Sequence, residues 1–97
     1  MNFKLSVKAE AIQDMAEAFD RYENKRVGLG AEFLGEVEGF FDRITQNPEH
    51  YQSHRDQRIA VMHKFPHKMF MKSSREMIIV YAVYHDKRSP EKLTERT

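Results

Sequence analysis

The chain has 97 residues, of which 40% are hydrophobic and 32% charged, and its formal net charge is +1. Its length suits a single domain, 1–97, with one modest core. No stretch approaches the roughly 20 apolar residues that cross a bilayer, and there is no cysteine for a disulfide or a thiolate metal site. We therefore expect a cytoplasmic domain held by packing alone, with no cofactor, metal or membrane partner.

The charge is divided unevenly along the chain. Residues 1–49 hold six Lys or Arg and ten Asp or Glu, a net of −4, whereas residues 50–97 hold ten and five, a net of +5. All five histidines lie in the second half. A basic face would suit RNA, DNA or an acidic protein. Alternatively, the asymmetry reflects only the preference of Glu for helices.

The first quarter of the chain predicts a short strand followed by a helix. Residues 3–7 alternate apolar and polar side chains, as a half-buried strand does. From Ala9 to Glu23 or Asn24 the apolar residues recur with helical spacing. The stripe expected to face the core is Ile12, Met15, Ala16, Phe19 and Tyr22. The residues expected outside it are Glu10, Asp14, Glu17, Asp20 and Arg21.

Two glycines, Gly28 and Gly30, predict a tight turn into a second helix, since glycine tolerates positive φ. That helix should run from about Ala31 to Thr45, because the Asn47-Pro48 pair resists helical geometry. Its apolar stripe is Phe33, Leu34, Val37, Phe41 and Ile44, with Phe40 at the edge. The short connection predicts an antiparallel helical hairpin.

The second half of the chain predicts three strands. Residues 49–57 are polar and indicate a loop, residues 58–65 and 67–72 indicate two strands separated by Pro66, and the polar tail 90–97 indicates a loose helical turn or disorder. The third strand, residues 77–84, is the longest apolar run in the chain.

This last strand is apolar on both faces, so it should be central and covered. In an extended chain the odd-numbered residues, such as Tyr81 and Val83, would face one way and the even-numbered ones the other. His85, Asp86, Lys87 and Arg88 follow at once. Titratable groups at the end of a rigid strand can form a preorganised site. Alternatively, they mark the return of the chain to solvent.

The element order is therefore β-α-α-β-β-β. Segregated helices and strands indicate the α+β class, with the helical hairpin packed on one face of an antiparallel sheet. The opposite face would be more open and basic. Its expected cations are Lys64, Lys68 and Lys72, together with Arg58.

Six stretches, taken in order, carry a resemblance to a known family: 6–11, 19–22, 28–34, 44–48, 64–70 and 80–90. With these stretches the chain resembles the RelE/ParE superfamily of toxins from bacterial type II toxin–antitoxin modules. The Gly-Leu-Gly before the second helix and the Phe-Pro after the first C-terminal strand are closer to the ParE-like, or plasmid stabilisation, branch. The resemblance implies the same arrangement of a helical hairpin against an antiparallel sheet.

The resemblance also implies a growth-arresting toxin. Its expected partner is a cognate antitoxin, and its expected target is either DNA gyrase or the ribosome with its mRNA. Operator DNA would be reached only through the antitoxin, and self-association is left open. Gyrase inhibition is the favoured activity. The alternatives are a ribosome-dependent mRNA endoribonuclease of the RelE type and a non-toxic binding module.

A nuclease would need a general acid or base and cations at the phosphate. The resemblance then implies catalytic roles for Arg58, His85 and Arg88, with Lys64 as extra positive charge. These residues do not make a complete acid–base pair, which favours gyrase inhibition over RNA cleavage. The alternative to a catalytic His85 is a structural one, hydrogen-bonded at the end of the strand. The chain also has seven Phe, four Tyr and six Met. This apolar excess predicts an antitoxin that docks through an amphipathic helix or an added strand.

Overall fold

The computed structural model describes residues 3–54 and 57–88; the predicted tail 90–97 lies outside them. The elements in chain order are β1 (Lys4–Val7), α1 (Ala9–Lys25), α2 (Leu29–Gln46), the 3₁₀ helix η1 (Pro48–His50), β2 (Gln52–His54), β3 (Gln57–Val61), β4 (His67–Ser74) and β5 (Met77–His85). In this part of the chain no helix is long and apolar enough to cross a membrane.

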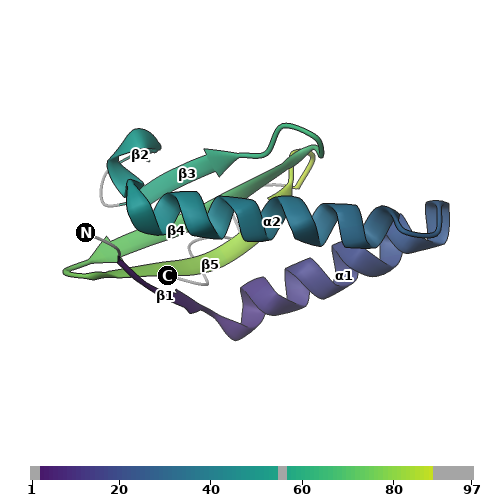
Figure 1. The fold of residues 1–97 in the computed structure, drawn as a ribbon, viewed down its shortest axis with the longest axis horizontal. Helices are drawn as coiled ribbons and strands as arrows, with labels where there is room; N and C mark the ends of the chain where they lie inside the picture. Colours follow the sequence, from purple (N-terminus) through teal and green to yellow (C-terminus); the bar gives the residue numbers. More distant parts are fainter. Residues whose placement is uncertain (1–2, 55–56, 89–97) are drawn as a thin grey trace.

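The strands form one sheet in the order β1-β5-β4-β3-β2, and the helical hairpin of α1 and α2 lies across one of its faces (Figure 1). The predicted α+β fold is therefore confirmed. The expectation of a fully antiparallel sheet is wrong at one edge, because β1 pairs with β5 in parallel. A parallel pair requires a long crossover. Here both helices and three strands separate the two partners in sequence, so the topology permits it.

Two boundaries in the second half differ from the prediction. The stretch 49–57, expected to be a loop, contains η1 and β2, whose backbone pairs with β3 although its residues are polar. The strand expected over 58–65 ends at Val61. A turn follows, closed by the Met62 N–H, which donates to the His67 carbonyl at 3.0 Å.

The core lies between the sheet and the helices. Its largest fully buried side chains are Phe33, Val37, Ile44, Met69, Met71, Ile78 and Val80. Phe40, expected at the edge of the α2 stripe, is 3% exposed and belongs to the core as well, whereas Leu34 and Phe41 are half-buried. A smaller cluster on the opposite face of the sheet consists of Phe70, Tyr81, Ala82 and Tyr84, with Ile59 beside it.

A β-bulge at Tyr81 decides which side chains of β5 reach each face. Phe70 pairs with Ala82 and the next residue of β4, Met71, pairs with Val80, so Tyr81 has no partner in the register. A bulge adds one residue and reverses the alternation beyond it. Ile78 and Val80 therefore face the helices, but beyond the bulge it is Val83 that does so. The uniform alternation expected from the sequence is wrong beyond Tyr81.

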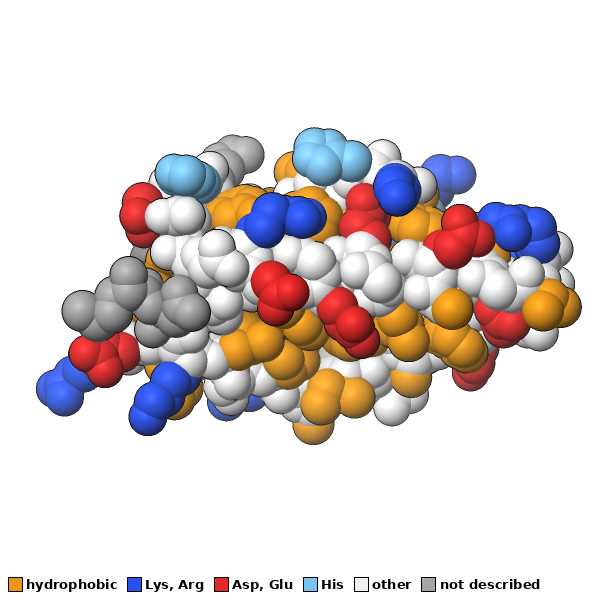
Figure 2. All heavy atoms as spheres, viewed as in Figure 1, with side chains coloured by type: hydrophobic (Ala, Val, Ile, Leu, Met, Phe, Trp, Pro, Cys, Tyr) orange, Lys and Arg blue, Asp and Glu red, His pale blue; other side chains and the backbone are white. Residues whose placement is uncertain are grey.

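The face that α1 turns to the sheet also differs from the prediction. Its buried residues are Ala11, Asp14 and Ala18, which are small enough for the helix to approach β5 closely. The larger apolar residues are displaced sideways, and Ile12 is 53% exposed. Asp14 was expected in solvent, yet it is 6% exposed. Figure 2 shows hydrophobic side chains gathered along the seam between the two helices.

The predicted turn between the helices is confirmed at Gly28, but Gly30 lies within α2, which begins at Leu29 and not at about Ala31. Gly28 has φ of 92°, a conformation that favours glycine. The Glu23 carboxylate accepts the backbone N–H groups of Gly28 at 3.0 Å and of Gly30 at 2.9 Å. Both bonds hold the pKa of Glu23 below its usual value, and the bond from Gly28 has the larger effect. They also satisfy donors that the start of α2 leaves free.

Candidate functional site

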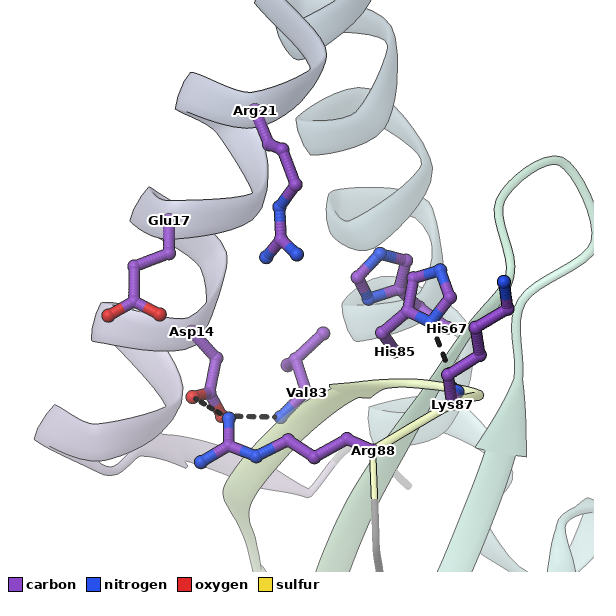
Figure 3. A pocket seen from close by; sticks show the side chains of 8 residues that line it. All are labelled: Asp14, Glu17, Arg21, His67, Val83, His85, Lys87 and Arg88. Atoms are coloured by element: carbon purple, nitrogen blue, oxygen red, sulfur yellow. Dashed lines mark hydrogen bonds and ion pairs between the residues drawn. The ribbon is translucent and has the colours of Figure 1, made fainter.

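A polar pocket of about 530 Å³ lies where β5 ends, between α1 and the first residue of β4 (Figure 3). Its lining residues are Asp14, Glu17, Arg21, His67, Val83, His85, Lys87 and Arg88. Because the bulge puts Val83 on the helix side, the alternation also directs His85 there. The bulge in β5 therefore creates the side of the pocket that the sheet supplies.

Asp14 holds the edge of β5 beneath this pocket. β1 pairs with β5 as far as Val80, so beyond that residue this edge has no strand partner in the described part of the chain. The Asp14 carboxylate fills this role, since it accepts the Val83 N–H at 3.0 Å. Its other oxygen forms an ion pair with the Arg88 guanidinium at 3.4 Å. A buried carboxylate on α1 thus continues the hydrogen bonding of the sheet.

Arg88 is held on two sides. Besides its ion pair with Asp14, its guanidinium carbon lies 4.1 Å from the centre of the Tyr84 ring, a cation–π contact. Tyr84 belongs to the cluster on the sheet face away from the helices. The Arg88 side chain therefore spans the edge of β5 and fixes the turn that follows the strand.

The two histidines of the pocket are in contact. The rings of His67 and His85 lie edge to face with their centres 5.2 Å apart. The His67 Nε2 is 2.9 Å from the Tyr22 hydroxyl, and its buried Nδ1 has no partner among the described residues. His67 is 3% exposed, and burial, assisted by repulsion from His85 and Arg21, lowers its pKa to about 4. His67 is therefore a neutral imidazole at pH 7.

His85 has one ring nitrogen engaged by the backbone. Its Nδ1 accepts the Lys87 N–H at 3.0 Å, so the proton of the neutral ring is on Nε2. The strand and the turn after it therefore fix both the position of the ring and its tautomer. Such a histidine presents one N–H to the pocket.

The sequence proposed Arg58, His85 and Arg88 as a catalytic set, and the structure brings together two of them. His85 and Arg88 line the pocket, whereas the Arg58 guanidinium donates to the Tyr51 carbonyl at 3.2 Å. Arg58 on β3 pairs with Met71 of β4, and His85 on β5 pairs with His67 of β4. Arg58 and His85 are therefore two strands apart and offset by four residues along β4. At about 4.8 Å per strand and 3.3 Å per residue, their backbones are about 16 Å apart.

The proposed basic face is likewise divided. Lys68 and Lys72 alternate with the buried methionines of β4 and lie with Phe70 on the face away from the helices. The Lys72 ammonium is 5.9 Å from the centre of the Tyr81 ring. Lys64 is in the turn after β3, and its backbone N–H donates to the Glu36 carboxylate on the helix side at 3.0 Å. Lys68 and Lys72 thus share a face that Lys64 does not.

A second hollow, of about 340 Å³, is an apolar groove between the helices. The groove residues are Ile12, Met15, Ala16, Phe19, Asp20 and Leu34. Most of them belong to the stripe that was expected to enter the core. Because small residues of α1 face the sheet instead, Ile12 and Ala16 of this stripe are exposed, and Met15 and Phe19 are only half-buried. Exposed apolar grooves can serve as sites of interaction.

Sequence reasoning missed Asp14, Arg21, Tyr22 and His67 as parts of one site. A signal was present for Asp14, since it falls between Ala11 and Ala18 on the helix face with the smallest side chains. For His67 no local signal existed, because its neighbours in the pocket come from α1 and from the end of β5. Within residues 3–54 and 57–88, no group of three His, Asp or Glu residues could hold a metal ion.

No protein-family model matches the chain, and no curated protein matches it in sequence. Among solved structures, its fold is similar to a chain from the structure titled "Chromosomal ParDE TA system from P. aeruginosa", with a TM-score of 0.75. The similarity covers 86% of this chain and 95% of that chain, at 10% sequence identity. Similarity at so low an identity concerns the fold alone, and the fold that the sequence resemblance implied is confirmed as ParE-like.

Proposed function

We propose that this chain, with its ParE-like fold, is the toxin of a type II toxin–antitoxin module that acts in the cytoplasm and arrests growth by inhibiting DNA gyrase. The similarity in fold over 86% of the chain carries the proposal. A cognate antitoxin neutralises the toxin, and operator DNA is reached only through that antitoxin.

The placement of the candidate catalytic residues favours gyrase over RNA as the target. Cleavage of RNA needs an acid, a base and cations around one phosphate. Arg58 is engaged with the Tyr51 carbonyl, and Arg88 with Asp14 and the Tyr84 ring. The arginines are thus used within the fold, which supports a toxin that binds its target without cleaving it.

The apolar groove between α1 and α2 supports a docking site for the antitoxin. An amphipathic helix can lay its apolar face into such a groove. Acidic side chains flank the seam in Figure 2, and the half of the chain that forms both helices has a net charge of −4. The partner helix would therefore carry Lys or Arg beside its apolar stripe.

The first experiment is induced expression of the chain, alone and with the product of the adjacent short reading frame. We expect arrest in the first case and growth in the second. Purified protein should block supercoiling by DNA gyrase and leave mRNA on ribosomes intact. Cleavage of mRNA at the ribosomal A site, lost in His85→Ala, would instead support the endoribonuclease. Unchanged growth without the partner would leave the binding module as the remaining function.

Two matched substitutions test the groove. Ile12 and Val27 are both exposed apolar residues of the helical layer, at 53% and 87%, but only Ile12 lines the groove. We expect Ile12→Glu to remain toxic and to escape neutralisation, because a carboxylate would be buried under the partner helix. Val27→Glu should remain both toxic and neutralised. Equal neutralisation of the two variants would exclude this groove as the docking site.

A further inference from the structure

The pocket at the end of β5 contains hydrogen-bond donors that have no acceptor among residues 3–54 and 57–88. Arg21 extends from α1 into the pocket, and Lys87, from the turn after β5, lines the pocket beyond the two imidazole rings (Figure 3). Within the described residues, no carboxylate forms an ion pair with either side chain. The Nδ1 atom of His67, at the pocket wall, is buried without a partner among the described residues. A buried polar atom of this kind is costly unless water, an ion or a ligand satisfies it.

The charges within the pocket leave an excess of positive charge. Asp14 and Arg88 pair with each other, which cancels one charge of each sign. Arg21 and Lys87 remain, against one carboxylate, that of Glu17. Glu17 is turned partly toward Gln13, whose amide donates to it at 3.2 Å.

One further carboxylate, that of Asp86, lies near the pocket without lining it. Asp86 lines a separate, smaller hollow with Lys68, Phe70, Tyr84, His85 and Arg88. Its charge still acts on Tyr22 and His67, but it does not line the main pocket, whose own lining keeps one excess positive charge.

The tautomer of His67 completes the set of donors. The Tyr22 hydroxyl lies 2.9 Å from the His67 Nε2, and when it donates to that nitrogen the proton of the neutral imidazole is on Nδ1. Residues with donor groups from α1, from the start of β4 and from the turn after β5 therefore line the same pocket.

We propose that this pocket binds the phosphate group of a small phosphate monoester, with Arg21, Lys87 and the His67 Nδ1–H as its donors. A phosphate presents three terminal oxygens to three donors on separate elements, whereas a carboxylate presents two. The volume of about 530 Å³ leaves room for the organic part of the ligand. The inference holds whether or not the chain is a toxin.

The test is an NMR titration of the ¹⁵N-labelled chain with inorganic phosphate and with methyl phosphate, at fixed pH and ionic strength, beside acetate in a parallel series. We expect saturable shifts at the backbone amides of Arg21 and Lys87 and at the His67 ring nitrogens. Acetate should bind more weakly. Shifts that do not saturate, that map elsewhere, or that acetate reproduces at the same concentration would overturn the proposal.

Three charge variants sharpen the test. Arg21→Gln should weaken phosphate binding about tenfold, the usual effect of one lost charge-assisted hydrogen bond. Glu17→Gln should strengthen binding, because it removes the opposing carboxylate. The matched control is Arg26→Gln, since Arg26 pairs with Glu32 at 2.8 Å outside the pocket. Equal affinities of Arg21→Gln and Arg26→Gln, or weaker binding by Glu17→Gln, would contradict the assignment.

Discussion

Replacement of Asp14 by alanine tests how α1 is attached to the sheet. The substitution removes the carboxylate that accepts the Val83 N–H at 3.0 Å and pairs with Arg88 at 3.4 Å. The Val83 N–H would then be a buried donor without an acceptor, because β1 does not reach this part of β5. We expect the edge of β5 to loosen and the whole domain to lose stability.

The magnitude follows from these two contacts. A buried donor left unsatisfied costs about 1–3 kcal/mol. The ion pair adds at most about 1 kcal/mol, because the Arg88 side chain is 36% exposed and solvent screens it. We therefore expect a loss of about 1–4 kcal/mol in the free energy of unfolding, which lowers Tm by roughly 5–30 °C in a domain of this size.

Urea denaturation and amide hydrogen exchange measure this effect. Asp14→Asn is the informative companion, because its amide oxygen can still accept the Val83 N–H while the charge is lost. It should cost no more than about 1 kcal/mol. Asp20→Ala, an exposed acid of the same helix, is the control and should stay within about 0.5 kcal/mol of the parent. The reasoning fails if Asp14→Ala matches Asp20→Ala, or if exchange at Val83 is unchanged.

Two further predictions concern the pH dependence and the helical turn. The pKa of His67 is about 4 in the folded chain, below its usual 6.5. As pH falls below 6.5, the unfolded chain therefore binds a proton at His67 before the folded chain does. The free energy of unfolding should fall by about 3 kcal/mol between pH 6.5 and pH 4. Urea midpoints should show this dependence flattened in His67→Phe and kept in the exposed-residue control His63→Phe. Gly30→Ala should lower Tm, since the new Cβ would lie 2.7 Å from the Phe19 ring and 2.9 Å from its carbonyl. Gly35→Ala, with open space around it, should not.

The elements of this fold could be predicted from the sequence, because each depends on local patterns. Helical spacing placed α1 and α2, and the Gly28 turn between them required a conformation that glycine favours. The strand β2 could not be predicted in this way. It is polar, and it exists because its backbone pairs with β3. Pairing of this kind is decided by tertiary structure.

The candidate site was predictable in part. His85 and Arg88 stood out because charged groups follow a buried strand, and both line the pocket. Arg58 was grouped with them on charge alone, and the register of the sheet places it elsewhere. Asp14 was misplaced because the largest apolar side chains of a helix need not be the buried ones. Where a helix approaches a sheet closely, small residues such as Ala11 and Ala18 take that place.

The single unmatched residue in β5 has a consequence for any residue-by-residue comparison of this chain with others. Up to Val80 even-numbered side chains face the helices, and from Val83 odd-numbered ones do, so parity changes at Tyr81. A regular strand that kept Tyr81 would turn His85 toward the side of Lys68, whereas deletion of Tyr81 would leave His85 facing the helices. An alignment without a gap at this position would therefore equate residues that lie on opposite sides of the sheet.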